Sequence, residues 1–129
     1  MTNNPIYDML ARLRNGQLAK KKFIYQPKNQ LCLKLLKIIY KEGYIKHYSC
    51  IDNKTIKIWL KYFDNSAVIK KLCVFSTGND RIFLSLNQLW KVDLDSKLLI
   101  LSTIKGFLSG KDSKKNKIGG KLICVIEWN

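Results

Sequence analysis

The residues with the clearest chemical potential form a short polar run, Ser102-Thr103-Ile104-Lys105-Gly106. The run follows an apolar stretch that predicts a buried strand. Hydroxyl groups at the tip of a rigid strand can hydrogen-bond phosphate or ribose, Lys105 adds positive charge, and Gly106 permits close backbone approach. The run is therefore a candidate RNA contact, although a plain turn at the end of a strand also accounts for these residue types.

The sequence contains no residue pattern that indicates catalysis. Ser102 and Lys105 match the Ser-x-x-Lys signature of penicillin-interacting enzymes, but that chemistry needs the serine at the start of a buried helix, and here it ends a strand. His47 is the sole histidine, the acids are scattered singly, and Gly119-Gly120 lacks the spacing of a phosphate-binding loop. We expect no catalytic residue, no metal site, no cofactor and no small-molecule substrate, and therefore no enzyme.

The four cysteines, Cys32, Cys50, Cys73 and Cys124, are far apart and form no Cys-x-x-Cys pair. Such spacing excludes a zinc ribbon. Because all four lie in apolar stretches, we expect buried, reduced thiols.

The charge balance indicates a polyanionic partner. The chain of 129 residues has 24 Lys and Arg against 9 Asp and Glu, a net charge of +15, and only Arg12, Arg14 and Arg81 are arginines. Lysine suits phosphate contact, whereas arginine is the usual reader of base edges. Residues 1–30 and residues 105–121 each hold six basic residues and one acid. These two segments predict two basic patches that recognise a nucleic-acid backbone.

The aromatic residues allow two interpretations. The 5 Phe, 6 Tyr and 3 Trp residues could stack on RNA bases from a sheet surface. Most of them alternate with lysines in predicted strands, however, and we favour core packing for them. Trp59 and Tyr25 are the preferred candidates for stacking, because lysines flank or approach both.

Periodicity predicts an α+β fold. Asn4 can cap a first helix that starts at Pro5, and residues 30–42 predict a second helix. The other expected elements are strands at 23–25, 44–51, 55–62, 68–75, 81–86, 97–103 and 121–127, a short helix at 87–91 and a polar loop at 105–120. A break at 64–66 predicts two lobes. We expect an N-terminal α/β lobe over 1–65, with two helices and a short sheet. We expect a C-terminal, mainly antiparallel β lobe over 66–129, with a short helix. No apolar run is long enough to span a membrane.

Five segments resemble those of a known family, the eighth protein of the bacterial-type small ribosomal subunit. They occur in the family's order and cover essentially the whole chain. They are Asn4-Pro5-Ile6-Tyr7-Asp8-Met9-Leu10-Ala11-Arg12-Leu13-Arg14-Asn15-Gly16-Gln17, the landmarks Glu42-Gly43-Tyr44-Ile45 and Leu60-Lys61-Tyr62-Phe63, and the pair Leu101-Ser102-Thr103-Ile104-Lys105-Gly106 and Gly119-Gly120-Lys121-Leu122-Ile123-Cys124-Val125-Ile126-Glu127-Trp128.

The resemblance implies a structural protein that binds the central domain of small-subunit ribosomal RNA during assembly, mainly through its C-terminal lobe, and that contacts the subunit's fifth protein. Together with the basic segments, it indicates these RNA-binding residues: Arg12, Arg14, Asn15, Lys20, Lys21, Lys22, Ser102, Thr103, Lys105, Gly106, Lys111, Lys114, Lys115, Gly119, Gly120 and Lys121. Two rival interpretations are a stand-alone organellar RNA chaperone or regulator and an RNA-modifying enzyme.

The chain departs from the family pattern at several positions. Ile104 replaces the second serine of the family's loop, Ala11 replaces a threonine, and Gly78-Asn79 stands for a Pro-Gly turn. Ile104 would either face the RNA or pack inward. With the A/T-biased residue usage, these departures favour a mitochondrial ribosome in the matrix, then a plastid ribosome, then the cytoplasm of a compact bacterium.

Overall fold

Both long helices begin at asparagine caps. In the computed structural model, which describes residues 4–75 and 82–129, the Asn4 side chain accepts hydrogen bonds from two backbone N–H groups of the first turn, at 3.1 and 3.2 Å, and α1 covers Pro5–Leu18. Asn29 caps α2 (Gln30–Lys41) in the same way. These bonds satisfy N–H groups that have no partner inside the helix. The two predicted helices are confirmed.

The remaining elements alternate strands with two short helices. In chain order, they are β1 (Phe23–Pro27), β2 (Ile45–Cys50), β3 (Thr55–Leu60), β4 (Tyr62–Phe63), β5 (Ser66–Ala67), β6 (Ile69–Val74), β7 (Phe83–Leu84), α3 (Leu86–Trp90), β8 (Lys97–Thr103), β9 (Gly106–Ser109), α4 (Gly110–Asn116) and β10 (Gly120–Trp128), with α2 between β1 and β2. The α+β class is confirmed. No helix in residues 4–75 and 82–129 has the length and apolar character needed to cross a membrane.

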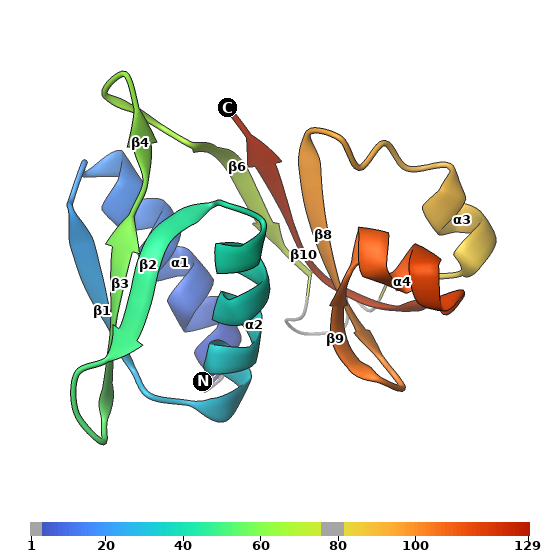
Figure 1. Cartoon of the computed structure of the whole chain (residues 1–129), viewed down its shortest axis with the longest axis horizontal. Coiled ribbons are helices and arrows are strands. Elements are labelled where there is room, and N and C mark those ends of the chain that lie inside the picture. Colours follow the sequence, from blue (N-terminus) through green and yellow to red (C-terminus); the bar gives the residue numbers. More distant parts are fainter. Residues whose placement is uncertain (1–3, 76–81) are drawn as a thin grey trace. The chain divides into compact units, whose positions relative to one another are not determined.

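The chain divides into two compact units, which we call the N-terminal unit (Met1–Lys70 with Asn129) and the C-terminal unit (Lys71–Trp128). In the N-terminal unit, β3 lies between β1 and β2 in an antiparallel sheet, and α1 and α2 lie on the same side of it (Figure 1). The side chains of β3 that point to the helices, Ile56 and Ile58, are fully buried. This alternation of buried and half-exposed residues produces a one-sided sheet.

The C-terminal unit is built on an antiparallel sheet in which β10 is central. The strand order is β6-β10-β8-β9, and β7 also pairs with β10. A leucine core joins the sheet to α3: Leu89, Leu94, Leu99, Leu101 and Leu122. Burial of these side chains is the main stabilising contribution to this part of the fold.

Two expectations about local structure are wrong, and a third is not tested. Residues 105–120 do not form a loop, because Phe107 and Leu108 pair with β8 to give β9 and Ser109 then caps α4. The strand expected at 81–86 is reduced to β7, because Ser85 and Gln88 form a reciprocal capping box that starts α3. The turn at Gly78-Asn79 and the side chain of Arg81 lie outside the described residues.

Most of the aromatic side chains are not buried, contrary to the core packing favoured for them. Of the Phe, Tyr and Trp side chains, all of which belong to described residues, only Tyr44 is buried. Leu, Ile and Met fill both cores instead. Phe75 is partly buried and packs against the leucine core, whereas Tyr25 and Trp59, the preferred candidates for stacking, are not buried.

Candidate nucleic-acid interface

The β8–β9 turn holds the predicted Ser-Thr-x-Lys-Gly site in a defined shape. Thr103 pairs with Gly106 across the turn, and its Oγ1 donates to the Gly106 carbonyl oxygen at 2.8 Å. The same Oγ1 accepts a hydrogen bond from the backbone N–H of Lys105 at 3.1 Å. The donor hydrogen of Thr103 is therefore used inside the turn, whereas Ser102 has no such bond to the turn. Thr103 shapes the site, and Ser102 is the hydroxyl that remains for a ligand.

The tip of this turn projects into solvent. Ile104 is 92% exposed, so it does not pack inward. Gly106 has φ +96°, a left-handed conformation that side chains disfavour, although a Cβ there would meet no atom. Lys105 Nζ donates to Asn116 Oδ1 of α4 at 3.2 Å. The tip thus presents an apolar side chain next to a lysine that α4 orients.

Gly119 and Gly120 support the turn from β10. A Cβ on Gly120 would lie 2.6 Å from the Ser102 carbonyl oxygen, and one on Gly119 would overlap the carbonyl oxygen of Leu84. Carbon and oxygen atoms do not approach so closely without displacement of the backbone. Gly119 therefore allows the chain to pass close to β7 just before β10 begins, and Gly120 allows β10 to pass close to Ser102 on β8.

Ser102 belongs to a row of side chains that crosses four strands. Its partners in the register are Phe107 on β9 and Lys121 on β10, and Lys121 is paired with Phe83 on β7. Directly opposed residues of antiparallel strands share a face of the sheet. The row therefore combines two rings, a hydroxyl and a cation. The sequence does not predict that Phe83 and Phe107 lie in this row, because residues 105–120 are expected to form a loop and Phe107 belongs to them.

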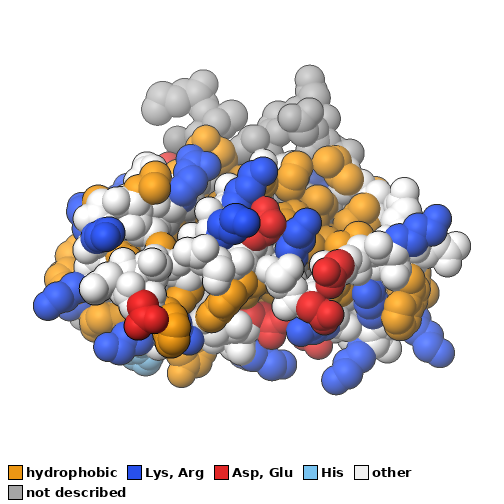
Figure 2. Space-filling view, turned by 90° about the horizontal axis from the view of Figure 1, so that it is seen from above, with side chains coloured by type: hydrophobic (Ala, Val, Ile, Leu, Met, Phe, Trp, Pro, Cys, Tyr) orange, Lys and Arg blue, Asp and Glu red, His pale blue; other side chains and the backbone are white. Residues whose placement is uncertain are grey.

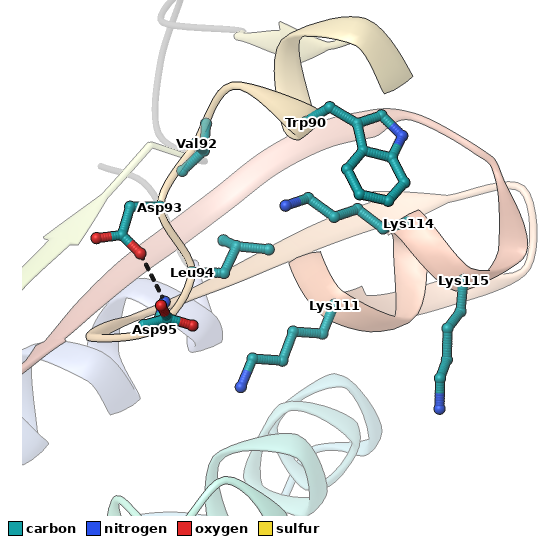
Figure 3. Close-up of a pocket in the computed structure, with 8 residues that line it drawn as sticks. All are labelled: Trp90, Val92, Asp93, Leu94, Asp95, Lys111, Lys114 and Lys115. Carbon is teal, nitrogen blue, oxygen red and sulfur yellow. Dashed lines mark hydrogen bonds between the residues drawn. The ribbon is translucent and has the colours of Figure 1, made fainter.

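The remaining C-terminal candidates project from α4. Lys111, Lys114 and Lys115 line a hollow of about 460 Å³ together with residues 90 and 92–95. Lys114 reaches toward Trp90, with Nζ 4.9 Å from the ring centre, while Lys111 and Lys115 point away from that ring (Figure 3). The carboxylates of Asp93 and Asp95 also line the hollow. A phosphate near α4 would therefore contact Lys111 and Lys115 at its rim.

Substitution of Ser109, which caps α4, and of Ser113, which lies within α4, should change the stability of the protein in opposite directions. Ser109 Oγ accepts a hydrogen bond from the backbone N–H of Asp112 at 3.2 Å, so Ser109→Ala should lower the free energy of unfolding by about 1 kcal/mol. Ser113 Oγ is buried and has no partner among the described residues, so Ser113→Ala should raise that free energy by about 1 kcal/mol. Urea denaturation measures both. Equal effects of the two substitutions would contradict the assignment.

The N-terminal candidates are only partly brought together. Arg12 and Asn15 lie on one face of α1 and line a hollow of about 810 Å³ with Lys21 and Lys22. The other two candidates, Arg14 and Lys20, are exposed but do not line it. Lys and Arg side chains are spread over the face seen in Figure 2 among scattered acidic ones. The predicted RNA-binding residues therefore occur in both units. In the N-terminal unit, four of the six predicted residues line a common hollow.

Two of the four thiols are buried in surroundings that oppose their ionisation. Burial raises the pKa of Cys124 to about 12, and burial with the nearby Asp8 carboxylate raises that of Cys32 to about 11, so both thiols stay protonated at neutral pH. The expectation of four buried cysteines is wrong for Cys50, which is exposed, and for Cys73, which is partly exposed. Among the described residues, no three His, Cys, Asp or Glu side chains gather as a metal site.

Comparisons with known proteins agree across nearly the whole chain. The family described as "Ribosomal protein S8" matches residues 4–127. The chain is 37% identical over 128 residues to "Small ribosomal subunit protein uS8" of Ruthia magnifica, covering 96% of this chain and 97% of the relative. It is 39% identical over 126 residues to the protein of that name from Nitrosomonas eutropha, covering 95% and 96%. The protein of that name from Wigglesworthia glossinidia brevipalpis is 37% identical over 126 residues, with coverage of 96% and 97%.

Proposed function

Because the chain belongs to the ribosomal protein S8 family, we propose that it is a structural component of a small ribosomal subunit that binds ribosomal RNA. The relatives named above are small-subunit proteins that match it from end to end, and this is the observation that carries the proposal. Other ribosomal proteins of the subunit are partners. The role is structural, and the site described above requires no reaction.

The finer part of the proposal concerns the RNA and the neighbours. The C-terminal unit offers Ser102, Lys105 and Lys121 around one turn, and the helix α4 adds exposed lysines. Such a set suits the phosphates and riboses of a folded RNA, because lysine is a point charge without the planar fork that reads base edges. We propose the central domain of the small-subunit RNA as the target and the subunit's fifth protein as a neighbour.

The source organisms of the relatives also help to assign the cellular compartment of this protein. Those named above are bacterial, which favours a bacterial small subunit, and hence the bacterial cytoplasm, over the mitochondrial matrix expected from residue usage. The stand-alone chaperone receives no support from proteins named as ribosomal components.

Sedimentation tests this proposal directly. The tagged full-length protein, expressed in its source cell, should migrate with the small subunit in stoichiometric amount, since a structural component is present once per particle. Crosslinking within that fraction should recover small-subunit ribosomal RNA at peptides around Ser102 and Lys121. A protein that stays at the top of the gradient at 50 mM salt would contradict the ribosomal role.

A further inference from the structure

The side of the N-terminal sheet that faces away from α1 and α2 carries a row of rings. Phe23 and Tyr25 occur on β1, Trp59 pairs with Phe23 from β3, and His47 pairs with Trp59 from β2. Lys57 pairs with Tyr25. We call these five residues the aromatic face. Tyr25 is 48% exposed, and none of the five is buried, so the face is open to a ligand.

The rings form a connected surface around one cation. The ring centres of Phe23 and Tyr25 are 5.5 Å apart, and those of His47 and Trp59 are 5.2 Å apart. Lys57 Nζ lies 3.9 Å from the centre of the Phe23 ring and 4.9 Å from that of the Trp59 ring. A cation in such a position is attracted by the electron-rich faces of the rings. Lys57 therefore joins the rings of β1 and β3 into one surface.

The surroundings of the aromatic face are cationic. The hollow described above, with Arg12, Lys21 and Lys22, also includes Phe23 and Tyr25. A second hollow, of about 560 Å³, has Lys46, Lys61 and Trp59 in its lining and shares Lys22 with the first. Among the described residues that line these two hollows there is no carboxylate. The rings are thus bordered by positive charge that would meet a polyanion.

We propose that the aromatic face binds unpaired nucleotides of an RNA strand. Bases stack on Tyr25, Phe23 and Trp59, and the phosphates lie beside the lysines of the two hollows. Every base has a π face, so stacking on such a platform tolerates many sequences. In a duplex these faces are already covered by neighbouring bases, and the surface therefore selects single-stranded RNA.

Two observations favour RNA over a protein partner. Lysine is depleted from the centres of protein–protein interfaces, yet Lys57 lies among the rings. The flanking hollows are cationic without acidic residues in their lining, which matches a phosphate backbone. The inference rests on the proposed function, because it adds a single-stranded contact to a protein that binds ribosomal RNA.

Binding of a labelled ten-nucleotide oligouridylate to the full-length protein tests the proposal, with an RNA duplex of equal length as the second probe. Tyr25→Ala should lower the affinity for the single strand by roughly 5- to 100-fold, the loss of one stacked base, and leave that for the duplex unchanged. Tyr25→Phe should retain binding, because the ring remains. Phe63→Ala is the matched control, since Phe63 is 73% exposed on β4 and outside the aromatic face.

Tryptophan fluorescence provides an independent measurement. In a protein with Trp90→Phe and Trp128→Phe, the single strand should quench the emission of Trp59, and the duplex should not. The proposal is overturned if Tyr25→Ala binds the single strand as the parent does, or if both probes weaken equally. Loss of a neighbouring protein from subunits containing Tyr25→Ala, with RNA affinity intact, would make the surface a protein-binding site and also overturn it. Sedimentation with the small subunit reports separately on the proposed function.

Discussion

RNA affinity is expected to fall by between about two and four orders of magnitude when the salt concentration rises from 50 to 200 mM. Eight candidate lysines can reach phosphates: Lys20, Lys21, Lys22, Lys105, Lys111, Lys114, Lys115 and Lys121. Each phosphate contact releases condensed counterions, so six to eight contacts give a slope of roughly −4 to −7 in a plot of log K against log salt. Titration of a small-subunit RNA fragment at several salt concentrations measures this slope.

Single substitutions show which lysines contribute. Lys111→Gln removes one exposed charge at the rim of the α4 hollow and should make the slope less steep by about 0.7 to 0.9. Lys37→Gln is the matched control, because Lys37 is an exposed residue of α2 that is not a candidate. A slope near zero in the unmodified protein would refute phosphate recognition, and equal effects of the two substitutions would refute the assignment to α4.

Gly120→Ala should destabilise the protein by about 3 kcal/mol, near the upper end of the usual cost of overpacking. The added methyl group would lie 2.6 Å from the Ser102 carbonyl oxygen and 2.8 Å from Thr103 Cγ2, and the first of these atoms belongs to the backbone. Relief of the clash requires β8 and β10 to separate at the candidate site. Urea denaturation followed by circular dichroism measures the loss of stability, and RNA titration should show weaker binding by the folded fraction.

Gly106→Ala is the comparison that isolates the steric effect. Its Cβ would meet no atom within 4 Å, so only the strain of φ +96° remains, at a cost of about 1–2 kcal/mol. Gly120→Ala should therefore be the more destabilising of the two. The reverse order would show that close approach of β10 to Ser102 is not what requires glycine.

Much of the fold could be predicted because its signals are local. A cap such as Asn4 acts within its own first turn, and the alternation along β3 repeats every second residue. The β9–α4 segment is not predicted, because the six lysines of residues 105–121 outweigh a weaker pattern, in which Gly106 permits a tight turn and Ser109 starts a helix. Apolar content alone does not reveal that Phe107 pairs with Ser102, since this pairing depends on the register of β8.

The site was predictable as a set of residue types and less so as an arrangement. Ser102, Lys105 and Lys121 were identified from their chemistry and from the family resemblance. The geometry separates residues that can bind a ligand from residues that shape the turn. Thr103 Oγ1 donates its hydrogen to a carbonyl oxygen within the turn, and Gly120 leaves space for the carbonyl oxygen of Ser102. Tyr25 and Trp59 can be named as stacking candidates from the lysines near them, but core packing is favoured for most of the rings, because apolar character does not indicate which side of a strand is covered.

Three properties of this protein follow from its residues alone: the α+β class, the excess of positive charge and the resemblance to a ribosomal family. These properties depend on composition and on short periodic patterns, which can be recognised without knowledge of long-range contacts. That Phe23 and Trp59 are neighbours around Lys57 depends on tertiary structure, since residues far apart in the chain meet through strand pairing. Tertiary structure also brings Arg12 and Asn15 of α1 into the same hollow as Lys21 and Lys22, because the chain turns back after α1 to form β1.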